Sequence, residues 1–128
     1  MLALIRQNSS TVSQTITYKL RTQKLSEEEL EYIIKNNKLT NYSQFLMCSM
    51  QTLSEGFIRK YKHLFKWGDI CTYQKLSEDF IREFICEFDH EDLWCIYAYQ
   101  SPSNSLYKEL KNIELSSKLK SSKLKYRE

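Results

Sequence analysis

A short phrase recurs four times along this chain. Its clearest copy reads Gln-Lys-Leu-Ser-Glu-Asp-Phe-Ile and begins at Gln74, and the other copies begin at Gln23, Gln51 and Gln100. Successive copies lie 23 to 28 residues apart. This spacing is typical of architectures in which each repeat buries its apolar face only against its neighbours. The chain is therefore expected to fold as an array of stacked repeats.

Each copy carries the signals of a helix start. Ser26, Ser54 and Ser77 are N-cap residues by type and position, and Ser26 with Glu29 fits the Ser-x-x-Glu pattern of a capping box. Apolar residues then follow at helical spacing. The predicted apolar faces comprise Leu30, Ile33 and Ile34 in the first copy, Phe57, Ile58, Tyr61, Leu64 and Phe65 in the second, and Phe80, Ile81, Phe84, Ile85 and Phe88 in the third.

A second, shorter helix is expected in the remainder of each repeat. In the later repeats it contains Trp67 or Trp94, and we expect both indole rings to pack between neighbouring helix pairs. The fourth copy, which contains Pro102, is not followed by a second helix with a tryptophan. It is therefore typical of a terminal capping helix. The second helix of the first repeat is expected to have Thr40 or Asn41 as its N-cap and to place on one face Tyr42, Phe45, Leu46 and Met50.

The composition agrees with a helical array. The chain has only two glycines and one proline among its 128 residues, which disfavours folds with many tight turns. We therefore predict an all-α fold, an array of about three and a half helix-turn-helix pairs over residues 23–115.

The two ends of the chain differ from this central domain. Ile16, Tyr18 and Leu20 alternate with polar residues, which is the period of a half-buried strand. Residues 1–22 are predicted to form either a β-hairpin, with Met1–Arg6 as its first strand, or a disordered arm, because two strands alone are only marginally stable. Residues 116–128 repeat Lys-Leu-Lys-Ser-Ser and are predicted to be a basic, disordered tail.

The net charge of +3 is unevenly distributed. Residues 23–115 contain 11 cations and 15 carboxylates, and residues 116–128 contain five cations and one carboxylate. The polar face of the second repeat is basic and that of the third is acidic. A partner-binding acidic face is predicted from Glu78, Asp79, Glu83, Glu87, Asp89, Glu91 and Asp92.

The basic residues of the second repeat and of the tail suggest nucleic-acid binding as an alternative to protein binding. Interleaved with Tyr61 and Phe65, they could contact phosphates with salt-dependent, sequence-blind affinity. A solvated face with ion pairs between repeats is the other interpretation. A nucleic-acid-binding surface would comprise Arg59, Lys60, Lys62, His63 and Lys66, together with the tail residues Lys118, Lys120, Lys123 and Lys125.

The cysteines and His90 are candidate ligands for a metal ion. Cys86 and His90 are four residues apart, a spacing that places two ligands on one helix face, and Cys95 and Cys71 could complete a set. However, the chain has no paired-ligand dipeptide of the zinc-finger type. We predict buried, reduced thiols at these cysteines and at Cys48, a surface histidine, and no metal or cofactor.

The histidine and carboxylate residues are also candidate catalytic groups. His63 lies among cations without a nucleophilic partner, and Glu83 with Glu87 is typical of a solvated face. The sequence has no Gly-rich phosphate loop and no Gly-x-Ser-x-Gly turn. We therefore predict no catalytic residues and no enzymatic activity.

The phrase Gln-x-Leu-Ser-Glu-x-Phe-Ile, preceded by Trp-x-x-Ile, resembles short helical repeats of uncharacterised phage and large-DNA-virus proteins. The residues that carry the resemblance are Gln74–Ile81, with Trp67–Ile70 ahead of them, and Gln51–Ile58. Trp94 departs from the pattern, because the next isoleucine lies two residues on and not three. The resemblance implies a viral or mobile-element origin, and binding in preference to catalysis.

The function expected from these observations is non-enzymatic protein binding. In its most concrete form, the protein would inhibit a host protein such as a defence nuclease, in the host-cell cytoplasm, with nucleic-acid binding as the alternative. The sequence has no secretory signal and no apolar run of 18 residues, so no membrane partner is expected.

Overall fold

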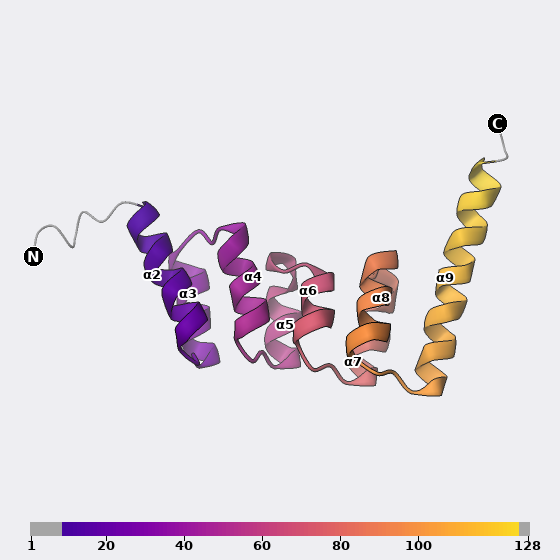
Figure 1. Ribbon diagram of the computed structural model, residues 1–128, viewed down its shortest axis with the longest axis horizontal. Coiled ribbons are helices and arrows are strands. Elements are labelled where there is room, and N and C mark those ends of the chain that lie inside the picture. Colours follow the sequence, from indigo (N-terminus) through magenta and orange to yellow (C-terminus); the bar gives the residue numbers. More distant parts are fainter. Residues whose placement is uncertain (1–8, 126–128) are drawn as a thin grey trace, which may run out of the picture. The chain divides into compact units, whose positions relative to one another are not determined.

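The computed structural model describes residues 9–125, and every regular element among them is a helix (Figure 1). The prediction of an all-α fold is thus confirmed. Two compact units divide after Gln74, with α2 to α6 in the first and α7 to α9 in the second. The elements, with 3-10 turns written η, are α2 (Ser9–Thr22), α3 (Glu27–Asn36), α4 (Asn41–Met50), α5 (Glu55–Tyr61), η1 (Lys62–Leu64), α6 (Trp67–Tyr73), α7 (Glu78–Glu83), η2 (Ile85–Glu87), α8 (His90–Tyr99) and α9 (Asn104–Lys125).

The helices that precede a copy of the phrase are here called the second helices; they are α2, α4, α6 and α8. In the first unit, α4 packs against both α2 and α6. These three helices form the nearer layer of that unit in Figure 1, and α3 and α5 lie behind them. The residue three positions before each phrase glutamine is fully buried in this layer, as seen for Leu20, Cys48 and Cys71.

The serine of each phrase copy caps the helix that follows it. The Ser54 and Ser77 hydroxyl oxygens each accept a hydrogen bond of 3.1 Å, from the backbone N–H of Phe57 and Phe80 respectively. Ser26 forms the predicted capping box. These bonds satisfy backbone donors that have no partner inside the helix. The cap predictions, including Thr40 for α4, are therefore confirmed.

The glutamine of the phrase joins one repeat to the one before it. The Gln51 side chain donates through Nε2 to the carbonyl oxygens of Leu20 at 2.8 Å and Gln23 at 2.7 Å. Its Oε1 accepts from the Leu25 backbone N–H at 2.9 Å. We call these three hydrogen bonds the glutamine joint. They satisfy backbone groups in the loop between a second helix and the next cap, where regular helical bonding has ended.

The same joint recurs one repeat later. Gln74 donates to the carbonyl oxygens of Cys48 at 2.6 Å and Gln51 at 2.7 Å, and accepts from the Leu53 backbone N–H at 2.9 Å. In the second unit, Gln100 accepts from the Leu76 N–H at 3.0 Å. The glutamine of the phrase is therefore structural, and the sequence reading assigned it no role.

The glutamate of the phrase also reaches the next repeat. The Glu27 carboxylate accepts from the Ser54 backbone N–H at 2.6 Å and from the Ser54 hydroxyl at 2.9 Å. Glu78 binds the Ser103 N–H and hydroxyl in the same way, at 2.8 and 2.7 Å. Hydrogen bonds to a charged acceptor are stronger than neutral ones, so this contact adds to the glutamine joint.

The first and fourth copies differ from this pattern at the residues that make the joints. The Ser26 N–H is bound by Glu29 of its own helix, at 3.4 Å. In the fourth copy, Pro102 stands where the other copies have a leucine N–H, and Asn104 stands where they have glutamate. Proline has no N–H to donate. Residues 104–125 form one helix, as the prediction of a terminal capping helix requires.

The predicted helix lengths are wrong. The first helices of the second and third repeats, α5 and α7, have only seven and six residues, and each passes into a 3-10 turn. Within each repeat the second helix is not the shorter one: α4 has ten residues as α3 does, α6 has seven as α5 does, and α8 has ten against six in α7. The regular helix ends where a buried aromatic residue leaves helical dihedral angles, at Tyr61 and Phe84. Each ring packs on the ring four residues earlier, with centroids 4.8 and 4.9 Å apart.

The strand predicted within residues 1–22 is wrong. Residues Ser9–Thr22 form α2, which also excludes a disordered arm over that range, and Met1–Arg6 lie outside the described residues. Ile16 and Leu20 are buried, but Tyr18 between them is 59% exposed. Residues four apart share a helix face, so the apparent alternation was a helical stripe. The Thr22 hydroxyl donates to the Tyr18 carbonyl at 2.7 Å, which accommodates this β-branched residue in a helix.

The disorder predicted for the basic tail is also wrong over residues 116–125. The backbone of α9 is helical from Asn104 to Lys125, and it is anchored by the buried side chains of Leu106 and Leu110. Lysine and leucine are good helix formers, so the helix continues past its packed first half. Residues 126–128 of the predicted tail lie outside the described residues.

Candidate functional site

The predicted acidic face lies within the second unit, but three of its members, Glu78, Asp89 and Asp92, have structural roles. Hydrogen bonds from Ser103 hold the pKa of Glu78 below its usual value, with a further contribution from Arg82. Asp92 is buried. It forms a reciprocal capping box with Asp89, with hydrogen bonds of 2.9 and 2.8 Å, and burial raises its pKa. Asp92 is therefore not available to a partner.

The other predicted acids are exposed. Asp79 and Glu83 lie on α7, Glu87 on η2 and Glu91 on the first turn of α8. Arg82 lies close to several carboxylates, with its Nε atom 2.9 Å from Glu109 and its guanidinium nitrogens 3.7 and 3.9 Å from Glu78 and Asp79. Such exposed pairs contribute little to stability, so this side of α7 is a mixed-charge surface and not a purely acidic one.

The predicted basic surface is divided between the units. Arg59, Lys60, His63 and Lys66 are exposed in the first unit and Lys62 is half-buried there. The Lys60 Nζ atom lies 2.9 Å from the Glu31 carboxylate, which raises the pKa of Lys60 and lowers that of Glu31. The tail residues belong to the second unit, on the helical backbone of α9: Lys118, Lys120, Lys123 and Lys125.

The cysteines do not share one environment. Cys48 and Cys71 are buried, as predicted, but Cys86 is exposed on η2 and Cys95 is half-buried. The prediction that all four thiols are buried is therefore wrong, because η2 interrupts the helix on which Cys86 was placed. His90 is 71% exposed, with its Nδ1 atom 3.1 Å from Glu114. Among residues 9–125, no three metal-ligating side chains lie together.

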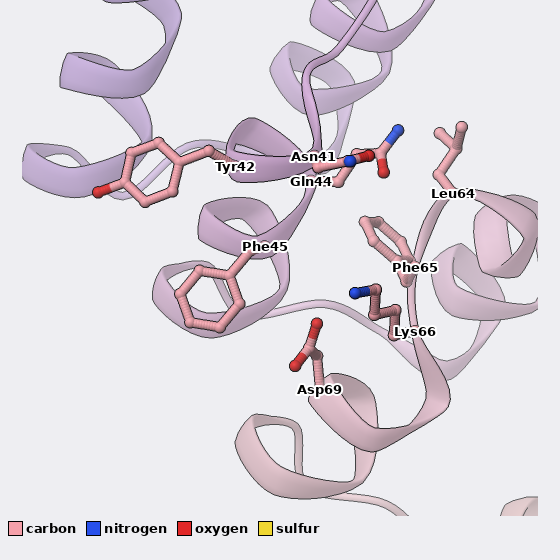
Figure 2. A pocket seen from close by; sticks show the side chains of 8 residues that line it. All are labelled: Asn41, Tyr42, Gln44, Phe45, Leu64, Phe65, Lys66 and Asp69. Atoms are coloured by element: carbon pink, nitrogen blue, oxygen red, sulfur yellow. The ribbon is translucent and has the colours of Figure 1, made fainter.

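A hollow of about 320 Å³ lies within the first unit, and sequence reasoning did not find it (Figure 2). The first turns of α4 form one wall, and the segment from the end of η1 to the start of α6 forms the other. Lys66 and Asp69 point toward α4 from the second wall. The residues that line the hollow are Asn41, Tyr42, Gln44, Phe45, Leu64, Phe65, Lys66 and Asp69.

The lining of this hollow is mixed: three aromatic side chains and Leu64 lie beside two amides and two charges of opposite sign. Phe45 is held in place by Tyr73 of α6, with ring centroids 5.8 Å apart and planes at 86°. Burial raises the pKa of Asp69, and the charge of Lys66 opposes that rise. An apolar surface with a few convergent polar groups is the usual composition of a ligand site.

Trp94 is placed differently from the prediction. Its side chain is 60% exposed and packs edge-on against Tyr99, with centroids 6.2 Å apart. Leu93 and Ile96 face the core of the second unit instead. The sequence held a signal for this: the two-residue step from Trp94 to Ile96 rotates by about 200° around a helix, so the two side chains lie on opposite faces. Trp67, three residues before its isoleucine, is half-buried.

The exposed large apolar side chains concentrate on the second helices. Tyr42 and Met50 of α4, which were predicted to share a packed face with Leu46, are both exposed, whereas Leu46 is buried. Among the side chains that the structure describes, in residues 12–116, six of the nine such residues lie on second helices: Tyr18, Tyr42, Met50, Tyr73, Trp94 and Tyr99. The other three are Tyr32, Tyr107 and Leu115.

Comparison with protein-family models, with curated proteins and with solved structures finds no match to this chain. Among residues 9–125, no helix has both the length and the apolar character needed to cross a bilayer.

Proposed function

We propose that the protein binds another protein, and that the hollow between α4 and the segment Leu64–Asp69 receives an apolar side chain of that partner. The observation that supports this proposal most strongly is the composition of the hollow, with three aromatic residues around a volume of about 320 Å³. Aromatic residues dominate the energetics of protein interfaces. The adjacent lysine and aspartate can bind the carbonyl and N–H groups of a peptide main chain, which favours a peptide segment as the occupant.

The repeated phrase supports a binding function indirectly. Its serine, glutamine and glutamate are occupied by caps and by contacts between repeats. The residues that differ between repeats are therefore mainly the exposed ones. Stacked repeats commonly bind partners through surfaces made of such exposed residues.

The narrower hypothesis, inhibition of a host defence nuclease by a viral protein, stays a prediction. It rests on the resemblance of the phrase Gln74–Ile81 to repeats of phage and large-DNA-virus proteins. Nucleic-acid binding also stays a prediction. The pairing of Lys60 with Glu31 leaves that surface less basic than its sequence suggested.

A matched pair of variants tests the proposed function. Candidate partners are captured with the intact protein, purified, and tested for direct binding. The Tyr42→Ala variant should weaken binding by about tenfold or more, since a truncated aromatic anchor commonly costs over 1.4 kcal/mol. Tyr18→Ala, an equally exposed tyrosine on α2, should leave it unchanged.

Two outcomes would contradict the proposal. One is that every captured protein is lost after nuclease treatment, which would favour the nucleic-acid reading. The other is that Tyr42→Ala and Tyr18→Ala bind a purified partner as tightly as the unaltered protein does.

A further inference from the structure

The exposed side of α8 carries an aromatic pair next to carboxylates. Glu91, Trp94 and Ala98 are all exposed, and their spacing of three and four residues places them on one helix face. Tyr99 lies beside this face and contacts Trp94 through its ring. Helical side chains lean toward the N-terminal turn, so Glu91 borders the indole ring.

The segment that carries this pair is acidic, although Lys111 of α9 lies over the ring of Tyr97 on the same helix, with its Nζ atom 4.6 Å from the ring centroid. No lysine or arginine occurs in residues 83–107, although the chain holds 19 such residues among 128. The exposed carboxylates of Glu87, Asp89 and Glu91 lie in the same stretch. Its one histidine, His90, is itself 3.1 Å from a carboxylate of α9. The negative charge repels phosphate groups and disfavours nucleic acid at this surface.

We infer that the α8 surface, defined by Glu91, Trp94, Ala98 and Tyr99, binds a basic protein segment through an arginine or lysine side chain. A cation over the face of an exposed tryptophan is attracted by the ring, and Glu91 can pair with the same cation. The small side chain of Ala98 leaves room on the helix beside the ring. This surface lies in the second unit and is separate from the hollow, so each site can be tested alone.

The test uses the full chain carrying Trp67→Phe, so that Trp94 is the only tryptophan. An arginine-rich decapeptide is titrated at low salt while Trp94 fluorescence is followed. Saturable quenching is expected, and Glu91→Lys should weaken the apparent affinity by about tenfold. A peptide with glutamate in place of arginine should cause no change.

Two control variants identify the source of the binding. Glu28→Lys makes the same change of charge at an exposed position on α3 and should weaken the affinity much less than Glu91→Lys. Tyr42→Ala, which alters the hollow, should leave peptide binding unchanged, so failure of the hollow and failure of the α8 surface give different results. Absence of quenching, or equal losses in Glu28→Lys and Glu91→Lys, would overturn the inference.

Discussion

The side-chain amide of Gln74 donates a hydrogen bond of 2.7 Å to the backbone carbonyl of Gln51, so the same residue of two successive phrases is in direct contact. Gln51 in turn binds the carbonyl of Gln23 at the same distance. The recurrence of glutamine in the sequence therefore has a physical cause. A side chain with both a donor and an acceptor group is needed to satisfy two carbonyls and one N–H in each loop.

Loss of one glutamine joint should destabilise the protein strongly. Gln51 is only 4% exposed, and Gln51→Leu would leave two carbonyls and one N–H without their partner. We expect a loss of about 2–4 kcal/mol in the free energy of unfolding, measured by urea denaturation. Gln23→Leu is the matched control, because Gln23 is exposed; its effect should stay within about 0.5 kcal/mol. Equal effects of the two substitutions would contradict a structural role for the joint.

Acid should weaken the contact between Glu78 and Ser103. The pKa of Glu78 is lowered in the folded protein by the Ser103 hydrogen bonds. A group with a lowered pKa contributes stability above its unfolded value, about 4.3 for glutamate, and loses it as the pH falls through the folded pKa. Between about pH 6 and pH 3, the Glu78→Gln variant should therefore lose less stability than the unaltered protein.

The control for this pH dependence is Asp79→Asn on the same helix. The Asp79 side chain is fully exposed and its nearest cation is 3.9 Å away. Its acid-dependent loss should match that of the unaltered protein, measured as the shift in urea midpoint between the two pH values. A Glu78→Gln variant with the same acid-dependent loss would refute the assigned role of the carboxylate.

Replacement of Gly56 by alanine should stabilise the protein. Gly56 is exposed in the first turn of α5 and does not have a positive φ angle. A Cβ atom there would meet only the Ser54 hydroxyl oxygen, at 3.9 Å. Gly56→Ala should raise the free energy of unfolding by about 0.5 kcal/mol, because alanine loses less backbone entropy in a helix. A lower melting temperature would argue against a helical first turn.

The four thiols should react at very different rates. Cys86 is exposed and Cys95 half-buried, while Cys48 and Cys71 are buried, and burial raises the pKa of Cys48 to about 12. Because the thiolate is the reactive form, iodoacetamide near neutral pH should label Cys86 first and Cys95 more slowly. Mass spectrometry of the digested protein measures the order. Labelling of Cys48 as fast as Cys86 in the folded protein would contradict this packing.

The features that could be predicted from the sequence are local ones. Ser26, Ser54 and Ser77 cap their helices through bonds only three residues long, so residue type and spacing were sufficient. The all-α class followed from the same signals. Residues 1–22 were misread because Ile16, Tyr18 and Leu20 fit an alternating pattern as well as a helical one, and only packing decides between the two.

The features that could not be predicted depend on contacts distant in sequence. The glutamine joint links residues 21 to 31 positions apart, and the hollow is lined both by residues of α4 and by Phe65 after η1. The recurrence of glutamine marked a repeat but did not reveal which backbone groups it would bind, and the lining of the hollow has no recurring pattern at all. Trp94 is the exception, since its two-residue step to Ile96 could have indicated an exposed ring.

The central claim is that binding uses the exposed aromatic residues Tyr42 of α4 and Trp94 of α8 and not the repeated phrase. Direct binding of a purified partner to two double variants tests it, with the melting temperature measured alongside. Tyr42→Ala with Trp94→Ala should abolish binding at unchanged melting temperature, whereas Tyr18→Ala with Tyr32→Ala should bind normally. Full binding by the Tyr42→Ala/Trp94→Ala variant would contradict the claim.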